Sequence, residues 1–167
     1  MQIIYQSSTE GPLMGLLTEH LTLYEARCRC GCGIEKLHVP ELTAQAQVLE
    51  ALRADLNADP ELEQYKPPGG EIRLIPMSWV RCDKHNTEVG GVALSRHRAF
   101  FCDATDISSP ELPEDLLHEK AAKYFTTAIH YLGRYFVHVD RRAWPDGEVH
   151  AWVKEPSETV LPGEARA

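Results

Sequence analysis

Hydrophobic residues recur at three- and four-residue steps in the stretch that follows Pro40. This spacing is typical of a helix that buries one face. A proline suits the first turn of a helix, where its missing N–H has no partner to lose. The pattern therefore predicts a helix that begins at Pro40. The apolar stripe consists of Leu42, Ala46, Leu49, Leu52 and Leu56.

A second apolar stripe predicts a helix from Leu116 to Leu132, and Gly133 can end it. Alternation of apolar and polar residues predicts short strands, one of them broken at Pro76. Helices and strands in this order indicate an α+β domain with a small antiparallel sheet flanked by helices. The predicted strands are residues 71–80, 100–107, 135–139 and 148–155.

Three further stretches set the limits of the domain. Residues 17–28 predict an extended piece that leads into a helical turn, and residues 57–70 are a polar loop rich in proline and glycine. A chain of 167 residues suffices for one domain. We expect that domain at residues 1–155 and a flexible tail at residues 156–167.

Charge and hydropathy exclude several functions. A net charge of −8 disfavours nucleic-acid binding, which needs clustered Lys and Arg. The sequence contains no apolar run of about 18 residues, so we expect no membrane span. The first residues lack the pattern of a secretory signal. We therefore expect a protein made in the cytoplasm, and we expect it to be a monomer. If its target lies outside the membrane, it would act in the periplasm or beyond.

The five cysteines fit a protein made in a reducing compartment. Cys28, Cys30 and Cys32 alternate with other residues, whereas a zinc ribbon has C-x2-C spacing. We interpret them as a tight turn that packs small side chains, with a metal knuckle as the alternative. Cys82 and Cys102 are interpreted as small buried side chains or, in the periplasm, a disulfide.

Candidate chemistry lies in residues 81–107. His97 and Asp106 are residue types that bind zinc, and they lie close together in a turn-rich segment. An open zinc site needs three protein ligands. The stretch FVHVD at residues 136–140 offers the third.

These phrases, in this order, resemble the zinc D-Ala-D-Ala carboxypeptidase family of murein peptidases, in its FVHVD subgroup. The resemblance runs from about Leu21 to Trp144 through LTLYEARCRCGCG, SWVRCDKHNTEVGGVALSRH, AxDI and FVHVD. It implies the fold shared by hedgehog signalling domains and DD-peptidases. It also implies that Zn²⁺ is bound by His97, Asp106 and His138.

The resemblance implies further roles around the ion. Arg81 matches an arginine that holds a substrate carboxylate, as a guanidinium fork can. Ser95 matches the serine of the motif, and His85 is a candidate to line the substrate cleft. Asp140 is our candidate for the general base, since alternate residues of a strand share a face with His138.

Three assignments keep alternatives. Eight residues separate His97 from Asp106, two more than is usual in the family, so Asp103 is the rival ligand. The two additional residues predict either a bulge that preserves the ligand direction or a damaged site. Glu148 is the other candidate base, and His150 is a candidate to stabilise an oxyanion.

These observations predict a zinc-dependent peptidase that cleaves peptidoglycan stem peptides at D-Ala-D-Ala or a related D-centre. Zinc-bound water supplies the nucleophile in such enzymes. A phage or prophage lysis enzyme fits a single domain without a signal. The alternatives are a non-catalytic module of the same fold that binds the wall or a partner, and a cytoplasmic D-Ala-D-Ala dipeptidase.

Overall fold

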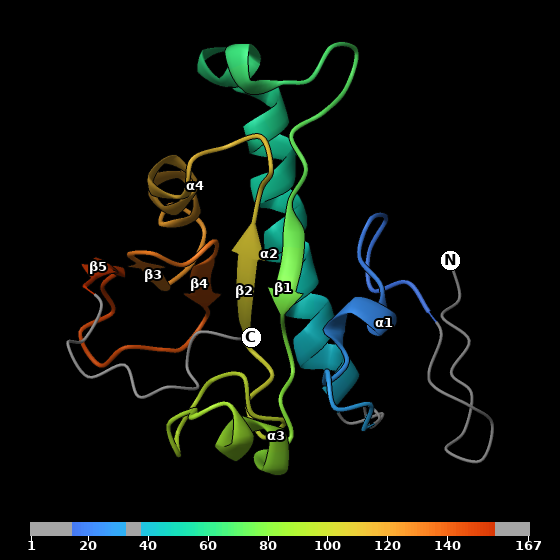
Figure 1. Ribbon diagram of the computed structural model, residues 1–167, viewed down its shortest axis with the longest axis vertical. Coiled ribbons are helices and arrows are strands. Elements are labelled where there is room, and N and C mark those ends of the chain that lie inside the picture. Colours follow the sequence, from blue (N-terminus) through green and yellow to red (C-terminus); the bar gives the residue numbers. More distant parts are fainter. Residues whose placement is uncertain (1–14, 33–37, 156–167) are drawn as a thin grey trace.

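The computed structural model describes residues 15–32 and 38–155, and the predicted tail at residues 156–167 lies outside them. Helix α2, Val39–Ala58, runs along the sheet (Figure 1) and carries the predicted apolar stripe on its buried face. Pro40 lies in its first turn, as expected. Among the described residues, no helix is long and apolar enough to cross a membrane.

The other helices are short. α1, Leu23–Ala26, begins with a capping box in which Thr22 and Glu25 satisfy each other's backbone N–H groups. The 3-10 helix η2, Pro60–Tyr65, lies in the stretch predicted as a loop. The remaining helices are α3, Asp83–Glu88, and α4, Glu114–Ala121.

One five-stranded sheet is present in the described part of the chain, in the order β1-β2-β4-β3-β5. Pro76 lies in β1, which is an edge strand, where a missing N–H is tolerated. The strands are β1, Ile75–Ser78; β2, Ala104–Ser108; β3, Thr127–Tyr131; β4, Val137–Asp140; and β5, His150–Lys154.

Two predictions of the fold are wrong in part. The predicted helix 116–132 ends at Ala121, and Thr127–Tyr131 forms β3, because the run TAIHY is rich in residues that favour strands. The sheet is also not wholly antiparallel. After β4 the chain reverses once, so β5 runs in the direction of β3 and pairs with it in parallel.

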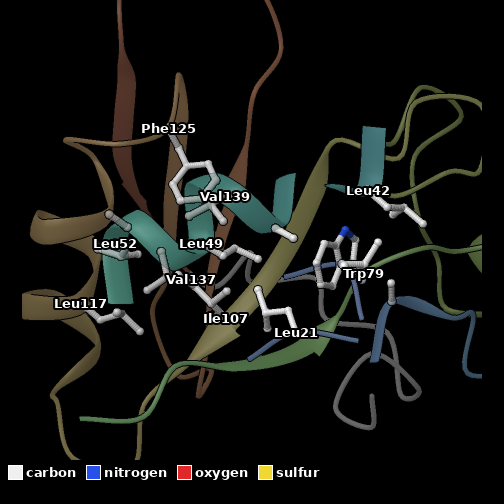
Figure 2. Close-up of a cluster of buried hydrophobic side chains, with 14 of the residues drawn as sticks. Leu21, Leu42, Leu49, Leu52, Trp79, Ile107, Leu117, Phe125, Val137 and Val139 are labelled. Carbon is white, nitrogen blue, oxygen red and sulfur yellow. The ribbon is translucent and has the colours of Figure 1, made fainter. Parts of the chain in front are cut away.

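One face of the sheet carries core residues, and the other carries two of the predicted metal ligands. One face packs against α2: Figure 2 shows Leu49 and Leu52 of this helix beside Ile107, Val137 and Val139 of β2 and β4. Since side chains alternate across a strand, the residues between these point to the opposite face. Asp106 and His138 therefore lie on the face away from α2, on strands that the core holds in register.

The double glycine near α3 forms a turn that has no room for a side chain. The Asn86 amide donates to the carbonyl oxygens of Gly91 and Val92 at 3.2 and 3.1 Å. A Cβ on Gly91 would lie 2.2 Å from Asn86 Oδ1 and 2.9 Å from the Asn86 carbonyl oxygen. The VGG motif thus closes the loop that leads from α3 to His97.

Replacing Gly91 by alanine is expected to lower the free energy of unfolding by about 1–3 kcal/mol, the usual cost of overpacking. Urea denaturation measures the change. Gly15→Ala is the matched control, because its Cβ would meet only Leu23 Cδ1, at 3.5 Å. Equal stabilities of the two variants would contradict the role assigned to the turn.

Candidate metal centre

The structure brings together one atom each from His97, Asp106 and His138. His97 Nε2 lies 3.1 Å from Asp106 Oδ1 and 3.0 Å from His138 Nδ1. His138 Nδ1 lies 3.0 Å from the same Asp106 oxygen. The three atoms thus form a nearly equilateral triangle, and all three side chains are at least nine-tenths buried.

Backbone pairing explains why residues far apart in sequence meet here. Asp106 on β2 and His138 on β4 are register partners in adjacent antiparallel strands. His97 comes from the loop before β2. Its carbonyl oxygen accepts the backbone N–H of Arg81 at 2.7 Å, which fixes this loop beside the end of the β1 segment.

Two hydrogen bonds on the outer side set the tautomers of the histidines. His97 Nδ1 lies 2.8 Å from the carbonyl oxygen of Trp79, which can only accept, so Nδ1 carries a proton. His138 Nε2 lies 3.0 Å from a carboxylate oxygen of Asp140 and donates to it. In each neutral ring the other nitrogen then points a lone pair into the triangle.

This donor set requires a cation. Two nitrogen lone pairs and a carboxylate oxygen face one another, with no hydrogen to satisfy all three. A zinc ion with ligand distances of about 2.0 Å would set them about 3.3 Å apart at tetrahedral corners, close to the spacing found. The residues therefore fit a zinc site with three protein ligands, which leaves a fourth position for water or substrate.

The pKa values of Asp106 and His138 also favour a positive charge at this place. Burial disfavours the charge of Asp106, yet His97 and His138 hold the pKa of this carboxyl well below its usual range. Burial also opposes a charged His138, but hydrogen bonds to Asp106 and Asp140 raise its pKa to about 9. Burial lowers the pKa of His97. Positive charge is therefore favoured beside Asp106, and a bound metal ion would supply it.

Asp140 lies behind His138. It is fully buried. Besides the His138 ring, the backbone N–H and the side-chain Nε of Arg142 donate to Asp140 Oδ1, at 3.1 and 2.8 Å. Despite its burial, these bonds hold the pKa of Asp140 well below its usual range. We predicted a general base at Asp140. Its position suits orientation of the His138 ring, since a carboxylate behind a ligand histidine fixes tautomer and direction.

Arg81 reaches the same site from the opposite side of Asp106. Its Nη2 donates to Asp106 Oδ2 at 2.7 Å, and its Nε donates to Ser78 Oγ at 3.1 Å. The guanidinium therefore neutralises the oxygen that does not face the histidines. The arginine predicted to bind a substrate carboxylate thus lies at the site and contacts a predicted ligand.

The rival ligand Asp103 has other partners. Arg96 binds both of its carboxylate oxygens, with Nε 2.9 Å from Oδ1. The two additional residues between His97 and Asp106 are taken up before β2 begins. The N–H groups of Phe101 and Cys102 donate to the Arg98 carbonyl oxygen at 2.8 and 3.1 Å. This connection therefore contains a turn, and Asp106 Oδ1 faces both histidines.

The other predicted residues contact different partners. Ser95 is buried and takes part in turns with Val92 and Arg98 through its backbone. The His85 ring lies 3.8 Å from Glu88. Glu148 is exposed, and its N–H donates to Asp146 Oδ1 at 3.0 Å. The same Asp146 pairs with His150 at 2.9 Å. None of these contacts joins the triangle.

Sequence reasoning missed two residues of the surroundings, Trp79 and Tyr131. The carbonyl of Trp79 carries no signal in a sequence. Pairing of Asp140 with one of the two arginines that follow it can be read from the sequence, and the structure has Arg142 in that place. Tyr131 was hidden in the predicted helix. By register it shares the face of His138, and burial and the charge of Asp106 raise its pKa. The alternation of TAIHY could have revealed it.

A mixed α+β domain that directs two histidines and an aspartate at one point offers the donor set of a zinc site with three protein ligands. The family model of Peptidase M15 matches residues 19–140. The chain therefore belongs to the peptidase M15 family, as the resemblance to zinc D-Ala-D-Ala carboxypeptidases predicted. A search among curated proteins finds no match.

Proposed function

We propose that this protein is a zinc peptidase that cleaves peptidoglycan stem peptides at D-Ala-D-Ala or a related D-centre, with the fold of hedgehog domains and DD-peptidases. Family membership supports a metallopeptidase. The observation that carries the proposal is the convergence of His97, Asp106 and His138, whose outer hydrogen bonds leave their lone pairs free for a metal ion.

The ion, when bound by these three residues, polarises a scissile carbonyl and lowers the pKa of water to about 7. The chain supplies orientation and charge around it. Asp140 and the Trp79 carbonyl hold the two imidazoles. Arg81 is our candidate to bind the carboxylate of the substrate. Its hydrogen bond to Asp106 places the guanidinium beside the proposed zinc ligands.

A digestion experiment tests the proposal. The zinc-loaded protein is incubated with purified peptidoglycan, with a soluble stem pentapeptide and with free D-Ala-D-Ala, and the products are identified by mass spectrometry. Release of D-Ala from the first two substrates, or scission of a cross-bridge, is the expected result. Cleavage of the dipeptide alone would identify a dipeptidase, and binding to the wall without cleavage would identify a non-catalytic module.

The proposal also includes the place where the enzyme acts. A monomeric peptidase made in the cytoplasm would reach the wall as a phage or prophage lysis enzyme does, after the membrane is opened. Co-expression with a protein that permeabilises the membrane tests this part. Lysis of the host is expected with the wild-type chain and not with His97→Ala.

Replacing Arg81 by lysine is expected to lower kcat/KM by about tenfold. A lysine ammonium is a single point charge, whereas the guanidinium holds Ser78 and Asp106 at the same time; losing one charge-assisted hydrogen bond costs about 1.5–3 kcal/mol. Steady-state kinetics and zinc content measure the effect. A rise in KM with full zinc would support carboxylate binding, and a loss of zinc would support a role through Asp106.

The control for this substitution is Arg73→Lys. Arg73 is an exposed arginine that pairs with Glu111 at 2.7 Å, away from the site. Its replacement should leave kcat/KM unchanged. If the Arg81→Lys enzyme matches this control in both kinetics and zinc content, the functional role proposed for Arg81 is contradicted.

A further inference from the structure

A second group of metal-binding side chains lies outside the site described above. Three cysteines of the CRCGCG motif meet a fourth from the start of α3, and their sulfur atoms all lie within 4.8 Å of one another. The four are Cys28, Cys30, Cys32 and Cys82. Cys32 and Cys82 are separated by 49 residues in the sequence, so the fold has brought them together.

The distances between the sulfurs distinguish metal binding from a disulfide. Cys28 Sγ lies 3.3 Å from Cys30 Sγ, which lies 3.5 Å from Cys82 Sγ. A disulfide needs about 2.05 Å, and all five cysteines of the chain are free thiols in this structure. Four thiolates around a zinc ion, each at about 2.3 Å, lie about 3.8 Å apart.

The expectation that this motif packs small side chains is wrong for two of its members. Cys28 is fully buried, but Cys30 and Cys32 are exposed. The expected turn itself is present: Gly31 has φ +83 and its N–H donates to the Cys28 carbonyl oxygen at 3.0 Å. The turn directs exposed thiols toward Cys82, which packing would not require.

Two backbone N–H groups point at sulfurs of the cluster. The Cys82 N–H points at Cys28 Sγ at 3.4 Å, and the His85 N–H points at Cys82 Sγ at 3.3 Å. Such hydrogen bonds stabilise the negative charge of thiolate ligands and fix their direction. Independent contacts hold the two segments together: the Val80 N–H donates to the Ala26 carbonyl oxygen at 3.1 Å, and Arg29 donates to that of Met77.

We propose that Cys28, Cys30, Cys32 and Cys82 bind a second zinc ion in a tetrathiolate site. Four soft sulfur ligands at tetrahedral spacing are a donor set that zinc prefers. With all four positions taken by protein, the ion is structural. It fastens the segment after α1 to the start of α3, directly beside Arg81.

Metal analysis and cobalt spectroscopy of the full chain, purified under reducing conditions, test the proposal. The wild type should hold two zinc ions, and Cys30→Ser/Cys32→Ser should hold one. After cobalt loading, His97→Ala/His138→Ala should keep the near-ultraviolet band that arises from sulfur-to-cobalt charge transfer, and the double serine variant should lose it. This readout needs no hydrolysis, so it stands even if the proposed peptidase activity fails.

Cys102→Ser is the matched control. Cys102 is the fifth cysteine, lies outside the cluster and donates to the Ala99 carbonyl oxygen at 3.0 Å, so this variant should retain both zinc ions. A reduced wild type without the sulfur band, or a double serine variant with two zinc ions, would overturn the proposal. If the double variant does not fold, titration of the wild type with a mercurial decides, because it should release one zinc per chain as the thiols react.

Discussion

Replacing His138 by alanine is expected to lower kcat/KM by at least about a thousandfold and to remove zinc from the His97–Asp106–His138 site. The substitution removes one corner of the triangle and the ring that joins Asp106 to Asp140. Without a bound ion, water loses the shift that brings its pKa from 15.7 to about 7. Hydrolysis of the stem pentapeptide and zinc content measure the two effects.

His130→Ala is the matched control for this variant. His130 is also a buried histidine and lies on the adjacent strand β3, opposite Val137, on the face away from the site. The substitution removes a buried side chain but leaves the three candidate ligands unchanged, so zinc content and kcat/KM should be retained. Full activity of His138→Ala would contradict both the site and the proposed function.

Replacing Asp140 by asparagine is expected to weaken zinc binding at the same site by about 10- to 100-fold, as is typical when the carboxylate behind a ligand histidine is changed. The amide loses the charge that pairs with His138 and Arg142. Competition with a chelator measures the affinity. At saturating zinc, kcat should recover to within about tenfold of the wild type.

This experiment separates orientation from proton transfer. A general base contributes about 10²–10⁴-fold to the rate, and added zinc would not restore that loss. A persistent loss of that size would make Asp140 the base, as its position in the sequence suggested. Glu148→Gln tests the other candidate base. Glu148 is exposed and its N–H donates to Asp146, so we expect both affinity and kcat to be unchanged.

Short-range patterns were readable in the sequence, and long-range pairings were only partly so. The stripe from Leu42 to Leu56 identified α2 because a long helix repeats its signal over many turns. The prediction of one helix over residues 116–132 is wrong in part. A helix of two turns and a strand of five residues together give the same apolar spacing as one longer helix.

The candidate metal ligands His97, Asp106 and His138 could be named from motifs, but their surroundings only in part. The Trp79 carbonyl behind His97 is visible only once the strands are placed. The packing expected for the cysteine motif is wrong for Cys30 and Cys32 for a similar reason. The spacing of the motif is unlike that of a zinc ribbon, and the fourth sulfur comes from another part of the chain.

The alternation of ligand and core residues along β2 and β4 limits how the chain can change in length. Asp106 is followed by the buried Ile107, and His138 lies between the buried Val137 and Val139. One residue inserted within either strand would turn a ligand into the core and a hydrophobic side chain toward the metal. We therefore expect changes in chain length to be tolerated in the turns, such as the one between His97 and β2, and not within β2 or β4.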